Sequence, residues 1–262
     1  MPRFISNGLS LFYEEYNSEA EKTVVFVHPA PLDRLAWIYQ IPYFAQFYRV
    51  IALDQRCFGL SDKPTFEFDI SEYGRDLESL FYELNLKASI VVGLSLGGIA
   101  AQFLAMFNPS LVKALVLADT LSATRNSAMI IQRVKRFREE GISYYEDAVR
   151  SLCSNTYLHT DTGKYFLNLF VERSRNLSVA SVSRCYEALS KLDITEKLSS
   201  IRIPTLVIAG TEDYAFADSK LISDKIPDAQ FAPLEGLGHV TQLEAPASFN
   251  SLVLDFIKSS AA

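Results

Sequence analysis

Short runs of continuous apolar residues recur along the chain, and most are separated by a segment with helical periodicity. These runs contain many β-branched residues, as is typical of strands that are buried on both faces of a parallel sheet. The expected strands of this kind are Thr23–His28, Arg49–Asp54, Ser89–Gly93, Val112–Asp119, Thr205–Ala209 and Gln230–Leu234. Strands that alternate with helices favour an α/β fold, in which helices cover both sides of a mostly parallel sheet.

The helices expected around these strands have apolar residues at helical spacing. Ser71–Leu84 carries them at positions 73, 77, 80, 81 and 84, on one face of a helix. Two further helices are expected at Leu96–Asn108 and Phe249–Ile257. The opening of the chain differs, because Asn7-Gly8 is a strong hairpin signal. It predicts an antiparallel pair of strands, Phe4–Ser6 and Leu9–Tyr16.

The alternation stops between about Leu121 and Leu198, where the sequence indicates successive helices and no convincing strand. The expected helices are Arg125–Glu140, Tyr144–Leu152, Lys164–Arg175 and Val179–Leu192, with Gly141 suited to end the first. We therefore predict an α/β core formed by residues 1–120 and 199–262. The helical segment 121–198 would be a cap inserted between two strands of this core.

Composition excludes several classes of protein. The formal net charge is −6, and the chain has no zinc-finger spacing and no extended Lys/Arg tract, which argues against a nucleic-acid partner. The longest apolar runs are far too short to span a bilayer, and the first residues lack the apolar region of a secretory signal. Three widely spaced cysteines argue against a disulfide framework. We expect a cytoplasmic protein without a membrane partner.

The strongest chemical signal is the run Gly93-Leu94-Ser95-Leu96-Gly97-Gly98. It follows an expected strand and opens an expected helix, which is the setting of a nucleophile elbow. Glycines beside the serine let strand and helix approach closely. The alternative is a glycine-rich turn that contains a serine by chance. The position between strand and helix favours Ser95 as a nucleophile, with the Leu96 N–H placed to bind an oxyanion.

Serine is a weak nucleophile and needs a general base. The chain has three histidines, His28, His159 and His239. His239 follows two glycines in the loop between the last short strand and the final helix, so we predict that it is the base. His28 ends a strand and suits an internal hydrogen-bonding role. His159, in the helical segment, suits an exposed loop better than the pocket.

The acid that orients the histidine should follow a strand between the serine and the histidine. Asp213 comes directly after Thr205–Ala209 in the turn Gly210–Asp213, and we predict that it fixes the imidazole tautomer. Asp119, at the end of an earlier strand, is the competing candidate, because some chains of this architecture carry the acid there. Either aspartate could instead cap a helix or turn.

A second oxyanion donor is expected from the loop after the strand that begins at Thr23. Proline has no N–H, so Pro29 and Pro31 cannot donate. Ala30 is the residue of this trio that can, and we predict that its N–H and that of Leu96 form the oxyanion hole.

These residues resemble the α/β-hydrolase superfamily over nearly the whole chain. The matching features are the Gly93–Gly98 run, the Asp54–Asp62 loop, the Gly210–Asp213 turn, and His239 followed by Glu244-Ala245-Pro246. The resemblance implies an eight-stranded sheet with a helical cap inserted after the sixth strand. The end of the chain is most similar to the 3-oxoadipate enol-lactonase-like and small carboxylesterase branch.

Two positions depart from the pattern of this superfamily. His28-Pro29 stands where His-Gly is usual, and Arg56-Cys57 stands where Arg-Gly is usual. Because positive φ is unfavourable for cysteine, we expect the loop around Cys57 to differ from its relatives. Haloalkane dehalogenases and epoxide hydrolases also have a proline at the position of Pro31. They use a carboxylate nucleophile, however, whereas this chain has a serine.

We therefore expect a carboxylic ester hydrolase that cleaves a small-molecule ester or lactone through an acyl-enzyme, with no cofactor and no metal. One alternative is a C–C bond hydrolase or lyase that uses the same triad. Another is a slow-turnover ligand receptor of the same fold.

The sequence does not determine the oligomeric state. Nor does it decide whether Arg125, Arg133 and Arg136 bind a substrate carboxylate or lie on a solvated helix face. Six residues of the expected cap could line an apolar pocket or simply pack within it: Tyr144, Tyr145, Tyr157, Phe166, Phe170 and Tyr186.

Overall fold

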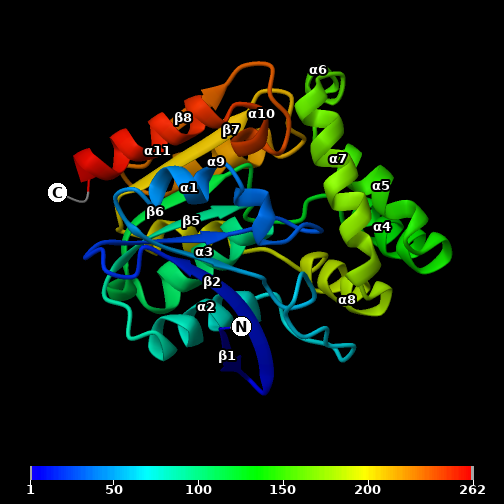
Figure 1. Ribbon diagram of the computed structural model, residues 1–262, viewed down its shortest axis with the longest axis horizontal. Helices are drawn as coiled ribbons and strands as arrows, with labels where there is room; N and C mark the ends of the chain where they lie inside the picture. Colours follow the sequence, from blue (N-terminus) through cyan, green and yellow to red (C-terminus); the bar gives the residue numbers. More distant parts are fainter. Residues whose placement is uncertain (1, 261–262) are drawn as a thin grey trace.

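Eight strands form one sheet in the computed structural model, which describes residues 2–260 (Figure 1). They are β1 (Arg3–Ser6), β2 (Leu9–Tyr16), β3 (Thr23–Val27), β4 (Arg49–Leu53), β5 (Ser89–Leu94), β6 (Val112–Ala118), β7 (Thr205–Gly210) and β8 (Gln230–Leu234). Their order in space is β1-β2-β4-β3-β5-β6-β7-β8. The pairs β1–β2 and β2–β4 are antiparallel, and the other neighbours are parallel. The expected mostly parallel, eight-stranded sheet is confirmed.

Helices cover both faces of this sheet. One face packs against α1 (Gln40–Phe44) and α11 (Pro246–Ser260), and the other against α2 (Glu72–Glu83), α3 (Leu96–Phe107) and α9 (Phe216–Lys225). Successive strand residues point to opposite faces. In β3, for example, residues 24 and 26 belong to the first apolar core and residues 25 and 27 to the second. Continuous apolar runs are therefore what this sheet requires.

The chain between β6 and β7 forms a group of helices that lies beyond one end of the sheet (Figure 1). These helices are α4 (Ser127–Glu140), α5 (Ser143–Arg150), α6 (Asn155–Leu158), α7 (Asp161–Arg173) and α8 (Val179–Leu189). Two backbone hydrogen bonds join the ends of this segment, from the Thr124 N–H to the Leu192 carbonyl and from the Ile194 N–H to the Ser122 carbonyl. We propose that residues 121–198 act as a cap on the core.

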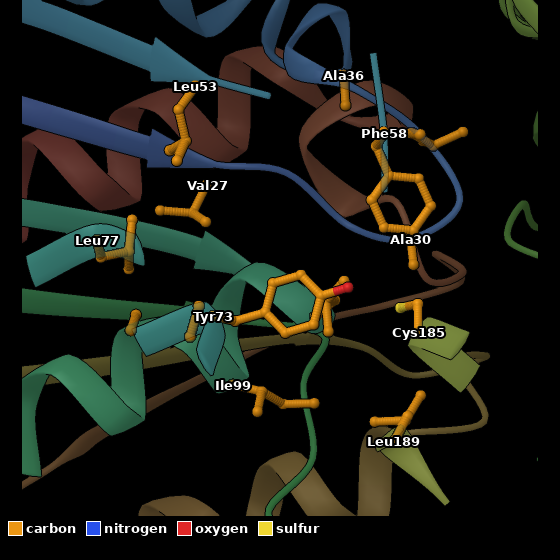
Figure 2. Packing of buried hydrophobic residues seen from close by; sticks show 14 of the residues in the cluster. Val27, Ala30, Ala36, Leu53, Phe58, Tyr73, Leu77, Ile99, Cys185 and Leu189 are labelled. Carbon is orange, nitrogen blue, oxygen red and sulfur yellow. The ribbon is translucent and has the colours of Figure 1, made fainter. Parts of the chain in front are cut away.

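The proposed cap packs against the core through α8. Figure 2 shows Cys185 of α8 beside Ala30, and both side chains are buried. Leu189 of α8 and Ile99 of α3 are also buried and line one cavity. Cys185 and Cys57 are buried free thiols, and Cys153 is partly buried and also free. No helix within residues 2–260 is long and apolar enough to cross a membrane.

The structure corrects the sequence analysis in two places. Cys57 itself adopts the positive φ that we expected it to avoid, with φ of 77°. Its N–H donates to the Asp62 carbonyl at 3.0 Å and its thiol lies 3.8 Å from the Tyr73 hydroxyl, so tertiary contacts hold this conformation. The second correction is helix α9, which we did not expect. The short helices α1, α6 and α10 (Thr241–Glu244) were also outside the prediction.

Candidate active site

Ser95 lies at the sharp turn between β5 and α3, with φ of 53° and ψ of −114°. A non-glycine residue with positive φ is strained, and such strain is common at functional sites. The flanking glycines make the turn possible. A Cβ at Gly97 would lie 2.0 Å from the Val27 carbonyl oxygen, and one at Gly93 would lie 2.3 Å from the Gly97 oxygen. The close approach of β3, β5 and α3 therefore holds the serine in place.

His239 and Asp213 meet although 26 positions separate them in the chain. Nδ1 of His239 lies 2.8 Å from Oδ1 of Asp213, and both residues are buried. The same carboxylate oxygen accepts the Ala215 N–H at 3.0 Å. This contact fixes a proton on Nδ1 and leaves Nε2 as the acceptor nitrogen of the neutral ring.

Asp119, the competing acid, has other partners. Its Oδ1 accepts the Gly210 N–H at 2.9 Å, and its Oδ2 accepts the Thr241 hydroxyl at 2.5 Å and the Thr241 N–H at 3.3 Å. Burial and the nearby Asp213 carboxylate raise the pKa of Asp119. Its contacts link β6 to β7 and to the start of α10, so Asp119 supports the site without touching the imidazole.

The electrostatics of His239 favour the protonated ring. Burial by itself would lower the pKa of His239, because it penalises the imidazolium. The charge of Asp213 and its hydrogen bond act in the opposite direction, with a smaller contribution from Asp119. These carboxylates prevail, and the pKa of His239 lies above its ordinary value of 6.5.

A tyrosine that the sequence analysis did not single out contacts the free nitrogen of His239. The Tyr214 hydroxyl lies 3.1 Å from Nε2, and the two rings stack with centroids 4.5 Å apart. A phenol is protonated at neutral pH, so the Tyr214 hydroxyl can donate to Nε2 of the neutral ring. Within residues 2–260, no hydrogen bond joins Ser95 to His239. The phenol therefore occupies the position that a serine hydroxyl would need.

The two predicted oxyanion donors both face the cavity that contains Ser95. Ala30 lies in the loop after β3, and Leu96 is the first residue of α3. The first N–H groups of a helix have no partner within the helix, and neither of these two donates to another atom of the described chain. Both are free to bind an oxygen of a bound molecule.

The cavity itself measures about 290 Å³ and lies between the carboxyl ends of the strands and the proposed cap. Arg125, Arg133 and Tyr186 line it, whereas Arg136 does not. Of the six cap aromatics considered above, Tyr186 is the one found in the lining. The volume suits a small molecule.

The remaining histidines lie apart from this cavity. His28 is buried, accepts the Gln55 N–H on Nε2 at 2.9 Å, and places Nδ1 2.9 Å from the Pro29 oxygen. The expected internal hydrogen-bonding role of His28 is confirmed. His159 is exposed, with Nδ1 2.7 Å from the Asn155 oxygen. The described part of the chain contains no group of three or more His, Cys, Asp or Glu that could hold a metal ion.

Comparisons with known proteins agree with this architecture. A sequence model described as "Alpha/beta hydrolase family" matches residues 24–252. 3-Oxoadipate enol-lactonase 2 of Acinetobacter baylyi is 26% identical over 261 residues, which cover 95% of this chain and 93% of that protein. A non-heme chloroperoxidase of Streptomyces lividans is 27% identical over 281 residues, covering 97% and 98%. The crystal structure of the enol-lactonase from Burkholderia xenovorans LB400 superposes with a TM-score of 0.91 at 23% identity, covering 98% and 100%.

Proposed function

This chain belongs to the alpha/beta hydrolase family, and from that premise we propose that it is a serine hydrolase that cleaves small-molecule esters or lactones. The observation that carries the proposal is the Asp213–His239 hydrogen bond beside a cavity that Ser95, Ala30 and Leu96 line. A curated relative of similar length is a lactonase by name, which supports this substrate class.

In the proposed mechanism, Ser95 Oγ attacks the carbonyl carbon while Nε2 of His239 accepts its proton. Asp213 keeps the other proton on Nδ1 and stabilises the imidazolium. The N–H groups of Leu96 and Ala30 bind the developing oxyanion. His239 then gives its proton to the leaving alkoxide, and an acyl-enzyme remains on Ser95. A water molecule, deprotonated by His239, releases the acid.

The Tyr214 hydroxyl must leave Nε2 before the serine can transfer its proton. The side chain is 48% exposed, so a bound substrate can displace it without disturbing the core. Asp213 holds His239 from the opposite side, on Nδ1, and this contact does not depend on the tyrosine.

The first experiment replaces the nucleophile. Ser95→Ala should abolish hydrolysis of an aryl ester and labelling by a fluorophosphonate, with an unchanged circular dichroism spectrum. Asp213→Asn should lower kcat by roughly 10⁴-fold, because the wrong imidazole tautomer would persist, whereas Asp119→Asn should lower it far less. Full activity in folded Ser95→Ala would refute the proposal. A larger effect at Asp119 than at Asp213 would assign the acid to β6.

The same assays distinguish two other functions from ester hydrolysis. A C–C hydrolase or lyase would lose activity in Ser95→Ala but act on a β-diketone-like substrate and not on esters. A receptor would perform a single slow turnover and retain its ligand. Repeated, rapid turnover of esters or lactones by the wild type supports the hydrolase.

A further inference from the structure

Arg133 is the one of three candidate arginines whose charge faces the cavity without a carboxylate beside it. Arg133 lies on α4, is half-buried, and makes no ion pair within residues 2–260. Its guanidinium carbon lies 5.8 Å from the ring centroid of Tyr214, and both residues line the cavity together with Ser95. A cation held in a small cavity attracts an anion strongly, because little water is present to screen it.

The other two arginines are neutralised by acids. Arg125 lines the cavity, but its Nε lies 2.9 Å from Oδ1 of Asp218, which also lines it. Arg136 pairs with Glu140 at 2.7 Å and with Asp147 at 3.0 Å, outside the cavity lining. Asp218 is the one acid among the described residues that line the cavity, and it already has a partner. The charge of Arg133 therefore remains uncompensated.

Tyr186, on α8, provides a second polar group in the lining of the same cavity. Its side chain is 2% exposed, and its hydroxyl lies near the Arg133 guanidinium without forming a hydrogen bond of ordinary length to any group of the described chain. A buried hydroxyl without a partner is costly, so a ligand that satisfies it gains binding energy. The Tyr186 ring stacks on Phe137 of α4, with centroids 5.7 Å apart, and this contact fixes its direction.

We infer that Arg133 and Tyr186 form an anion subsite, and that the preferred substrates are esters or lactones that carry a free carboxylate. The inference rests on the proposed function, since Ser95 supplies the reacting end of the cavity. The carboxylate would accept from the guanidinium and from the Tyr186 hydroxyl, which orients the carbonyl toward Ser95. A cavity of about 290 Å³ has room for a short dicarboxylic monoester.

The test compares two aryl esters with one leaving group, the 4-nitrophenyl monoester of glutaric acid and its neutral methyl ester. Wild type should hydrolyse the anionic ester with the higher kcat/KM. Arg133→Met should lower kcat/KM for the anionic ester by roughly 10- to 100-fold, as expected for a lost charged hydrogen bond. The neutral ester should change by less than about threefold. Tyr186→Phe should lower the anionic rate about three- to tenfold.

Arg136→Met is the matched control, because it removes an arginine from the same helix without changing the cavity. It should leave the ratio of the two rates unchanged. Equal loss of both rates in Arg133→Met would overturn the subsite and indicate a structural role. Unchanged rates in that variant would also overturn it, while ester hydrolysis itself still supported the proposed function.

If wild type hydrolysed neither ester, the proposed function would fail. A measurement of carboxylate binding would then test the anion subsite independently of hydrolysis. Calorimetry with glutarate should then detect binding to wild type and its loss in Arg133→Met. No binding of glutarate to wild type would overturn the inference.

Discussion

His239 is held from three directions, and these contacts decide its chemistry. Asp213 binds Nδ1, the Tyr214 hydroxyl contacts Nε2, and the backbone N–H donates to the Leu152 carbonyl at 2.8 Å. The first contact sets the tautomer, the second competes with Ser95, and the third ties the histidine loop to the proposed cap. The ring thus has a fixed position, but its accepting nitrogen is already occupied.

We expect Tyr214→Phe to raise kcat/KM for a neutral aryl ester by about two- to tenfold. The variant keeps the ring that stacks on His239 and removes the hydroxyl that must be displaced from Nε2, a hydrogen bond worth about 0.5–1.5 kcal/mol. Steady-state kinetics measures the change. Tyr165→Phe, at an exposed position on α7, should have no effect. A tenfold loss in Tyr214→Phe would mean that this hydroxyl assists the reaction.

The raised pKa of His239 predicts the pH dependence of the reaction. The neutral ring is the active form, so kcat/KM should rise with pH through one ionisation and then level off. The midpoint should lie above 6.5, because Asp213 and Asp119 outweigh both burial and the opposing charge of Arg133. Stopped assays from pH 5 to 9, repeated after EDTA treatment, measure it.

Asp213→Asn is the control for this assignment. Its residual activity should have a lower midpoint, because the main cause of the raised pKa of His239 is removed. A wild-type midpoint below 6.5, or activity that rises below about pH 5, would contradict the role of His239 as the base.

Single residues were predictable from the sequence where a motif fixes their setting. The strand–turn–helix context pointed to Ser95, and chain order pointed to Asp213 and His239, which the structure joins by a hydrogen bond; their catalytic roles remain predictions. Tyr214 belongs to no motif, although its position next to Asp213 was a possible signal. The choice among the three arginines could not be made either, because it depends on which acids fold next to each.

At the scale of elements, the packing of β3, β5 and α3 forms the framework of the site. The strands were predictable to within about one residue at most ends, because continuous apolar runs mark strands that are buried on both faces. Helix α9 was missed because its apolar residues are few, and much of Phe216–Lys225 is polar or charged. Its position on the sheet next to β7 stabilises it, and a local pattern does not report such contacts.

We expect Gly97→Ala to lower the free energy of unfolding by about 3 kcal/mol or more. The new Cβ would lie 2.0 Å from the Val27 carbonyl oxygen, and backbone atoms on both sides cannot move without separating α3 from β3. Urea unfolding followed by circular dichroism measures the change.

Gly8→Ala is the comparison for this substitution. No atom of residues 2–260 lies within 4 Å of a Cβ at position 8, so the variant should lose only about 1–2 kcal/mol for its positive φ. Equal losses of unfolding free energy in the two variants would mean that the close approach at Gly97 does not cause the destabilisation.

At the scale of the whole molecule, Glu244 connects the proposed cap to the loop that carries His239. Its two carboxylate oxygens accept from the Ser154 N–H at 2.8 Å, the Ser154 hydroxyl at 2.5 Å and the Gly238 N–H at 3.2 Å. Ser154 lies between α5 and α6, and Gly238 immediately precedes His239. One side chain therefore fixes the proposed cap and the histidine loop relative to each other.

Glu244→Gln tests this connection. The amide keeps the size of the side chain, but its NH₂ group cannot accept a hydrogen bond. At least one of the groups on Ser154 and Gly238 that now donate to Glu244 therefore loses its acceptor. We expect the free energy of unfolding to fall by about 1–3 kcal/mol. The amide hydrogens of Gly238 and His239 should exchange faster, and kcat should fall because His239 is less well oriented.

Glu146→Gln supplies the reference, because the one ion pair of Glu146 in the described chain is with Arg150, at an exposed position on α5. An exposed ion pair of this kind contributes about 0–1 kcal/mol, so stability and exchange should hardly change. Faster exchange that spread evenly over the sheet in Glu244→Gln would indicate general destabilisation. Faster exchange confined to residues 152–158 and 236–244 would indicate that the carboxylate specifically joins the proposed cap to the histidine loop.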